Sequence, residues 1–154
     1  YVYARGYLVL LGKQPLSIEQ LAALNPEPGT RLAIANPDHA PYGMAARQAL
    51  QSVDLWDPWT DQFVIAESIQ HSYELLNRGD VDYALTALSL VKGDPERRWF
   101  RITGKLHQPI DQEIGIPTTS THPKIAREFI SFLRKKKGRS ILSQYGFTFP
   151  DRSH

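Results

Sequence analysis

The sequence predicts an α/β fold with a mostly parallel sheet flanked by helices. The main observation is the order of the elements, since short apolar strands alternate with amphipathic helices before two final helices. The 154 residues are 42% hydrophobic and 22% charged, which is typical of a globular chain with a substantial core. No apolar run in the sequence approaches the ~20 residues that a membrane-spanning helix needs.

Compact apolar runs mark the expected strands. Four such runs are expected to form buried strands, at residues 7–11, 32–35, 63–66 and 81–88. A further extended segment over 110–117 is expected to cross between two lobes. The turn residues Gly, Asn and Pro follow several of these runs and separate them from the helices.

Helix signals lie between the first strands. Ser17 and Gln20 have the spacing of a capping box, which predicts a short helix through Leu21 and Leu24. Residues 43–53 have apolar and small side chains at helical spacing. A helix is therefore expected after each of the first two strands.

Three more helices follow the third strand. Ser68 is expected to cap a helix that begins near Ile69 and ends at Gly79, a typical C-terminal glycine. Pro123 opens another helix, and residues 140–145 are expected to form a final turn or two. One apolar face of the Pro123 helix contains Ile125, Phe129, Phe132 and Leu133.

Two basic segments favour a structural interpretation. Residues 92–107 are charged and irregular, and Arg97–Phe100 is expected to be a charged turn leading into a buried Trp99. The run Arg134–Arg139 is expected to be the solvated end of a helix stopped by Gly138. The alternatives are an aromatic and basic contact surface for the first segment, and contact with nucleic acid or anionic lipid for the second.

Composition excludes several function classes. The formal net charge is +2, from 18 basic and 16 acidic residues, which is small for a nucleic-acid-binding protein. The absence of cysteine excludes disulfides and thiolate metal sites. The sequence has no Gly-x-Ser-x-Gly motif, no zinc-type histidine spacing and no phosphate-binding glycine loop, so an enzyme, a metal site and a nucleotide site have no support.

Two strand-to-helix corners are the candidate binding positions. They lie at residues 35–43 and 66–70, where expected strands lead into expected helices. Ligands of open parallel sheets bind beyond the carboxyl ends of the strands. A helix N-terminus offers unpaired N–H groups and a partial positive charge, so these corners could hold a small dianion without Lys or Arg.

A resemblance to a known family is carried by residues 36–46, NPDHAPYGMAA. This segment closely resembles periplasmic molybdate-binding proteins of ABC transporters, and the resemblance extends across nearly the whole chain. Residues 3–10 are similar to the family's crossover strand, and residues 55–57, LWD, to its turn after the following helix. Residues 84–91 are similar to its hinge-side strand, and residues 144–147, QYGF, to its closing motif.

The resemblance implies a type II periplasmic-binding-protein-like fold, in which two α/β lobes close on a tetrahedral oxyanion. The expected ligand is molybdate or tungstate, bound by backbone N–H groups and hydroxyls, with no cofactor and no metal site. Tyr42 matches the family's binding position in the first corner, and Ile69 matches the backbone donor that opens the next helix. Ser68 is a neighbouring candidate. Ala87 matches a position where some members place a ligand-contacting tyrosine.

The resemblance also predicts how the chain is divided. Residues 1–108 are expected to hold a crossover strand and the second α/β lobe, and residues 109–154 the return strand and the C-terminal helices of the first lobe. Family members begin with a segment that has no match here, so one complete lobe and part of a second are expected. Phe129 and Phe132 would then be exposed, unless an N-terminal piece, a domain swap or a homo-oligomer covers them.

The leading hypothesis is a periplasmic or membrane-anchored extracytoplasmic protein that delivers molybdate or tungstate to the membrane permease of an ABC importer. It is not expected to be an enzyme. The alternative is a sensory or interaction module of the same fold with altered or lost ligand binding. Phosphate is a minor alternative ligand, because its proton needs an acceptor such as Asp38 or Glu67 facing inward.

Overall fold

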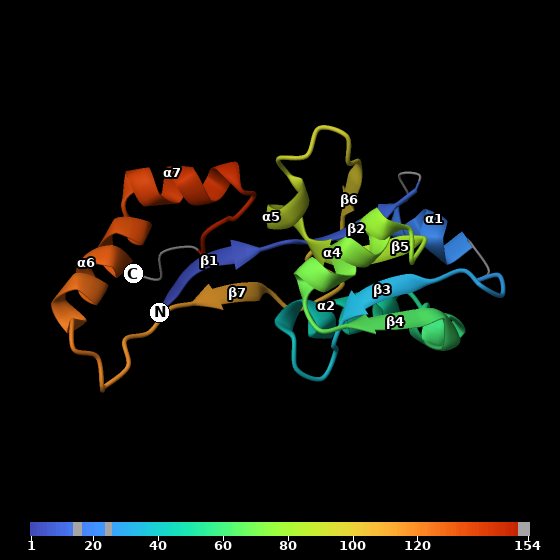
Figure 1. The fold of residues 1–154 in the computed structure, drawn as a ribbon, viewed down its shortest axis with the longest axis horizontal. Helices are drawn as coiled ribbons and strands as arrows, with labels where there is room; N and C mark the ends of the chain where they lie inside the picture. Colours follow the sequence, from blue (N-terminus) through green and yellow to red (C-terminus); the bar gives the residue numbers. More distant parts are fainter. Residues whose placement is uncertain (14–16, 24–25, 151–154) are drawn as a thin grey trace.

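The computed structural model describes residues 1–13, 17–23 and 26–150. Its main body is a five-stranded sheet with the strand order β4-β3-β5-β2-β6 (Figure 1). These strands are β2 (Leu8–Gly12), β3 (Leu32–Ala35), β4 (Phe63–Ala66), β5 (Tyr83–Ala87) and β6 (Trp99–Arg101). β1 (Val2–Gly6) and β7 (Ile110–Glu113) form a separate antiparallel pair.

The sheet is mixed. β3 is parallel to β4 and β5, whereas β2 is antiparallel to β5 and β6. The α/β class is confirmed, and four of the five strands run in the same direction, with only β2 opposed to them. The reason is that β2 enters the sheet from the β1–β7 ribbon and β6 runs back toward it, so Leu8 at the start of β2 pairs with Ala87 at the end of β5.

Helices alternate with the strands. The helices are α1 (Ile18–Ala23), α2 (Pro41–Ser52), α3 (Trp56–Trp59), η1 (Thr60–Gln62, a 3-10 turn), α4 (Ile69–Arg78), α5 (Leu88–Val91), α6 (Pro123–Arg134) and α7 (Lys136–Gln144). The predicted capping box is confirmed, since the Gln20 N–H donates to Ser17 Oγ and the Ser17 N–H donates to Gln20 Oε1. The predicted glycine stop is also confirmed, since Gly79 has a φ of 79° at the end of α4. Leu24 lies outside the described residues.

Both faces of the central strands β2, β3 and β5 are buried. Along β2 the side chains alternate, so that Leu8 and Leu10 belong to one apolar cluster and Val9 and Leu11 to another. The first cluster contains α2 residues and the fully buried Trp59, while the second contains α4 and α5 residues. Two buried faces explain why these strands are continuous apolar runs in the sequence.

The β1–β7 ribbon connects this sheet to α6 and α7, which lie together at the other end of the molecule (Figure 1). Arg5 Nε donates to Asp111 Oδ1 at 2.6 Å across the ribbon. Residues after α7 return to the same ribbon. There the Arg5 N–H donates to the Thr148 carbonyl oxygen at 2.7 Å, and the Thr148 N–H donates to the Arg5 carbonyl oxygen at 2.9 Å. Among the described residues, no helix combines the length and apolarity needed to cross a membrane.

Two expectations about basic segments are wrong. Trp99 is 38% exposed, because it lies in the three-residue edge strand β6, whose residues are all exposed. Gly138 does not stop a helix. It is a buried residue within α7, and a Cβ there would lie 2.3 Å from the Phe132 carbonyl oxygen, so it permits close contact between α6 and α7.

The expected exposure of the α6 face is confirmed in part. Phe129 is 53% exposed and Ile125 is 63% exposed, whereas Phe132 is half-buried. On α7, Ile141 and Tyr145 beyond its end are also exposed. The two C-terminal helices therefore present apolar side chains to solvent in the described part of the chain.

Candidate functional site

Two helices begin at one edge of the sheet. β3 and β4 are parallel and in register, so their last residues, Ala35 and Ala66, are paired. The Asn36 N–H then donates to the Ala66 carbonyl oxygen at 2.9 Å and joins the two strand ends. The loops into α2 and α4 therefore leave from the same edge, where the sequence places its two candidate corners.

The N-terminus of α2 has free backbone donors. Ala40, its N-cap, is extended and provides no side-chain cap, and Pro41 has no N–H. Within the described residues, the N–H groups of Tyr42 and Gly43 donate no hydrogen bond. A Cβ on Gly43 would lie 2.4 Å from the Ala35 carbonyl oxygen, so glycine lets α2 begin directly against the end of β3.

The Tyr42 side chain reaches from α2 to the ribbon. It is 9% exposed, and its hydroxyl oxygen lies only 2.0 Å from the position that a Cβ on Gly6 would take. Burial, with a smaller contribution from Tyr3, raises the pKa of Tyr42 to about 12. The hydroxyl is therefore protonated at neutral pH. It has no hydrogen-bond partner in the described part of the chain and remains available as a donor.

The N-terminus of α4 is capped and fixed. Ser68 is extended, with φ −151° and ψ 168°, and its Oγ accepts a hydrogen bond from the His71 N–H at 3.1 Å. This confirms Ser68 as the N-cap. Among the described residues, the N–H groups of Ile69 and Gln70 donate no hydrogen bond, so they are free donors at the start of α4.

Two buried hydroxyls position Ile69, and sequence reasoning missed both. The Ile69 carbonyl oxygen accepts hydrogen bonds from Thr86 Oγ1 and from Ser72 Oγ, each at 2.8 Å. Thr86 and Ser72 are fully buried, and Thr86 lies on β5. The first turn of α4 is thus tied to the neighbouring strand. The polar residue Thr86 within the apolar segment 84–91 is the sequence feature that could have indicated such a contact.

Ala87 belongs to the same apolar cluster as Tyr42, and the partly buried Ile69 packs against that cluster. Ala87 is fully buried at the end of β5 and has only a methyl side chain, so it offers no side-chain donor. The structure therefore places Tyr42, Ile69 and Ala87 in or against one apolar cluster, with Ser68 directly before Ile69. Their role in binding a ligand stays a prediction.

The charged side chains described at this edge are paired or exposed. Arg47 on α2 pairs with Asp38 at 2.9 Å, and its guanidinium lies 5.1 Å from the Trp56 ring centroid. Asp38 and Glu67 are both exposed. His71 Nδ1 accepts from the Glu67 N–H at 3.3 Å. Within the described residues no group of three His, Cys, Asp or Glu side chains could hold a metal ion.

The structure thus combines an α/β sheet, a two-stranded ribbon and free backbone donors in the first turns of α2 and α4, an arrangement that suits a solute-binding protein. The chain belongs to a family described as bacterial extracellular solute-binding protein, whose model matches residues 1–148. The resemblance noted in the sequence is thereby confirmed at the level of the family.

The curated relatives include two molybdate-binding proteins. The protein ModA of Azotobacter vinelandii is 30% identical over 151 residues, which cover 96% of this chain and 60% of the relative. ModA of Rhodobacter capsulatus is 27% identical over 147 residues, covering 96% of this chain and 58% of the relative. The chain therefore spans about 60% of the length of these relatives.

Solved structures show the same fold. The periplasmic molybdate-binding protein of Azotobacter vinelandii superposes with a TM-score of 0.88 at 26% identity, over 98% of this chain and 68% of that chain. The sulfate-binding protein SubI of Mycobacterium tuberculosis has a TM-score of 0.73 at 13% identity, over 97% of this chain and 58% of that one. The predicted type II fold, with part of one lobe, is consistent with this coverage.

Proposed function

We propose that the chain binds a tetrahedral oxyanion, molybdate or tungstate, as the solute-binding component of an ABC importer. The relatives named molybdate-binding protein support this ligand. The proposed site makes and breaks no covalent bond, so the protein is a carrier and not an enzyme. Relatives named as periplasmic or as a lipoprotein support a location outside the cytoplasmic membrane, next to the permease that would receive the anion.

The observation that carries the proposal is the set of free donors at one sheet edge. The N–H groups of Tyr42 and Gly43 and those of Ile69 and Gln70 belong to two helices that begin there. Two helix N-termini add partial positive charge, and the buried hydroxyl of Tyr42 adds a neutral donor. Charge-assisted hydrogen bonds from such donors are worth roughly 1.5–3 kcal/mol each.

The same geometry favours fully ionised anions over phosphate. Molybdate, tungstate and sulfate have no proton to donate at neutral pH, whereas protonated phosphate needs an acceptor. Asp38 is engaged by Arg47 and Glu67 is exposed, so neither supplies that acceptor toward the donors. Size then has to separate molybdate and tungstate from sulfate. Ala87 is fully buried and adds no side-chain donor.

The division of the chain is also a proposal. The boundary between 1–108 and 109–154 falls in the loop just before β7, and the exposed face of α6 belongs to the second part. Cover for Phe129 by a domain swap or a homo-oligomer stays a prediction. Size-exclusion chromatography with light scattering distinguishes a monomer from such an assembly.

The test is an Ile69→Pro variant titrated with molybdate by calorimetry and thermal shift. Proline is tolerated at the first position of a helix, and the extended Ser68 suits a following proline. The variant therefore removes one N–H donor with little change expected in the helix. Molybdate affinity should fall by about tenfold or more.

The matched control is Ile69→Val, which keeps the N–H donor and should bind molybdate like the unmodified chain. Sulfate and phosphate serve as competing anions, and a molybdate-specific rise in melting temperature is expected. Equal molybdate affinity in the proline variant would refute the corner at Ile69. An equal response to all three anions would refute the selectivity.

A further inference from the structure

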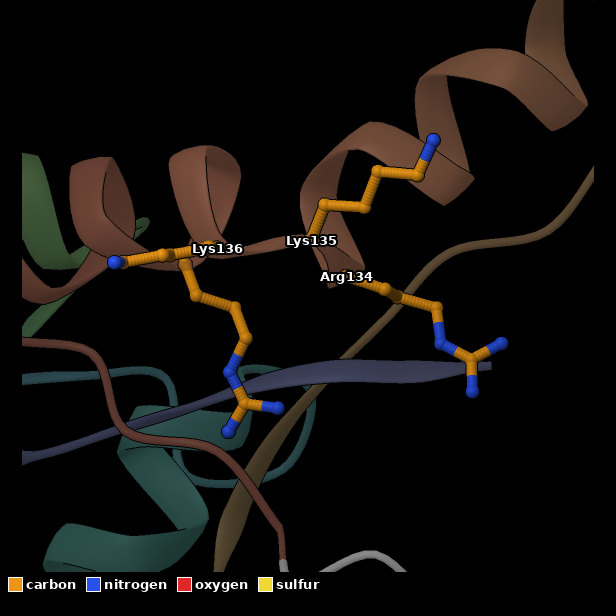
Figure 2. A pocket seen from close by; sticks show the side chains of 4 residues that line it. Arg134, Lys135 and Lys136 are labelled. Atoms are coloured by element: carbon orange, nitrogen blue, oxygen red, sulfur yellow. The ribbon is translucent and has the colours of Figure 1, made fainter.

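A cluster of basic side chains lies away from this edge, at the junction of α6 and α7 (Figure 1). A pocket of about 540 Å³ is lined there by Arg134, Lys135, Lys136 and Arg139, and we refer to it as the basic pocket. Figure 2 shows the side chains of Arg134, Lys135 and Lys136 fanning out from the junction. Arg134, Lys135 and Lys136 are exposed and Arg139 is half-buried, so the basic pocket is an open depression on the surface.

Backbone packing shapes the basic pocket. Lys135 is extended, with φ −84° and ψ 166°, and is both the C-cap of α6 and the N-cap of α7. Its side chain does not cap α7. Gly138 allows α7 to contact the Phe132 carbonyl and the Leu133 Cα of α6, where a Cβ would lie within 3 Å of both. The four basic residues are therefore presented by a fixed helix–helix junction.

No ion pair within the described residues neutralises the charges of the basic pocket. In the described part of the chain none of its four side chains forms an ion pair, whereas Arg47 and Arg78 on the main body each pair with an aspartate. Arg139 instead lies over the Phe149 ring, with 4.1 Å from Cζ to the centroid, which orients the guanidinium without reducing its charge. The mutual repulsion of the four cations favours binding of an anion.

The helix dipole adds to this preference. Lys136 and Lys137 lie in the first turn of α7, where the partial positive charge of the helix N-terminus disfavours cations. Lysines in the first turn are therefore unfavourable for the stability of α7. An anion at the junction would relieve both the repulsion between side chains and the unfavourable dipole contact.

We propose that the basic pocket binds a phosphoryl group carried on a larger molecule. One arginine guanidinium can donate two parallel hydrogen bonds to two phosphate oxygens, and lysines add positive charge around them. The pocket has more space than one tetrahedral anion fills, so it accommodates the group to which the phosphate is attached. A free phosphorylated compound and the headgroup of an anionic phospholipid share this chemistry. The proposal is independent of the oxyanion site at α2 and α4.

The experiment titrates the chain with two probes: inorganic pyrophosphate, followed by calorimetry, and phosphatidylcholine vesicles containing phosphatidylglycerol, followed by sedimentation. The test variant is Lys136→Gln/Arg139→Gln. The matched control is Arg98→Gln/Lys105→Gln, which removes two exposed charges elsewhere. Affinity for the bound probe should fall by about tenfold or more in the test variant and by less than about threefold in the control.

The outcomes separate the sources of the phosphoryl group. Binding of pyrophosphate indicates a free phosphorylated ligand, and binding of the anionic vesicles alone indicates a lipid headgroup. Equal losses in the two double variants, or binding of neither probe, would overturn the proposal. Lys135→Gln/Lys136→Gln tests the same pocket while keeping the Arg139 contact with Phe149. Tyr42→Phe should leave pyrophosphate binding unchanged, which distinguishes this site from the oxyanion site.

Discussion

The Tyr42 hydroxyl occupies the space that a side chain at Gly6 would need. A Cβ on Gly6 would lie 2.0 Å from Tyr42 Oη and 3.0 Å from its Cζ. Tyr42 lies in the first turn of α2, and Gly6 is the last residue of β1. The position of a proposed ligand donor is therefore set by the ribbon that connects the sheet to α6 and α7.

Gly6→Ala should displace the Tyr42 ring and with it the hydroxyl donor. The unfolding free energy should fall by about 1–3 kcal/mol, which is typical of an overpacked core. Molybdate affinity should fall by about tenfold because one hydrogen bond is lost. Urea denaturation and calorimetry measure the two effects. Gly115→Ala is the control, since a Cβ there meets no atom within 4 Å. Unchanged molybdate affinity in Gly6→Ala would remove Tyr42 from the site.

Tyr42→Phe should remove the pH dependence that the buried phenol contributes. The pKa of Tyr42 is raised from 10.0 to about 12, so the neutral form stabilises the fold. That stabilisation is complete below pH 10 and is lost as the pH rises through 12, by roughly 2–3 kcal/mol in total. Urea denaturation at increasing pH, compared between the chain and the variant, measures this difference. Parallel curves would mean that the phenol is not desolvated.

Gly43→Ala should be the most destabilising of these glycine substitutions. Its Cβ would lie 2.3 Å from the Asn36 carbonyl oxygen and 2.4 Å from that of Ala35, and backbone atoms cannot rotate away. The unfolding free energy should fall by more than about 3 kcal/mol. Thermal and urea unfolding provide the measurement. Gly93→Ala, where a Cβ meets nothing within 4 Å, should change little. A similar stability for the two variants would contradict the close seating of α2.

Ser68→Asp should separate helix capping from anion binding. Aspartate is as good an N-cap as serine, so α4 should keep its stability, whereas Ser68→Ala should lose about 1 kcal/mol. The added carboxylate would repel a dianion held by the Ile69 N–H, so molybdate binding should be abolished in Ser68→Asp and retained in Ser68→Ala. Circular dichroism and calorimetry together check both expectations. Molybdate binding by Ser68→Asp would place the anion elsewhere.

Local signals predicted the local structure. The capping residues Ser17 and Gln20, the Gly79 stop and the apolar runs of β2, β3 and β4 all lie where the sequence indicates. β6 escaped prediction because a three-residue edge strand with every residue exposed has no apolar run and no alternation. The break between α6 and α7 at Lys135 escaped it because a continuous basic run resembles a single solvated helix end.

The sequence predicted the two strand-to-helix corners of the site, but not the long-range contacts that hold Tyr42 and Ile69 in place. Strand ends followed by helix starts indicated residues 35–43 and 66–70, and the family resemblance selected Tyr42 and Ile69. The contact between Gly6 and Tyr42 depends on long-range placement of β1, which no local pattern encodes. The hydrogen bond from Thr86 to Ile69 depends on the packing of α4 against β5 in the same way.

Two strands, β1 and β7, join the main body to the C-terminal helices, and the segment after α7 is tied to β1 by the hydrogen bonds between Arg5 and Thr148. The two-stranded ribbon acts as a torsional axis, since twisting it preserves its hydrogen bonds and pulling its strands apart breaks them. Away from that axis, Lys92 Nζ donates a hydrogen bond to the Ser143 carbonyl oxygen, with 2.8 Å between the two atoms. A rotation of α6 and α7 about the ribbon would therefore strain this hydrogen bond together with the packing of Gly146 against Leu88, where a Cβ would lie 2.8 Å from the Leu88 side chain.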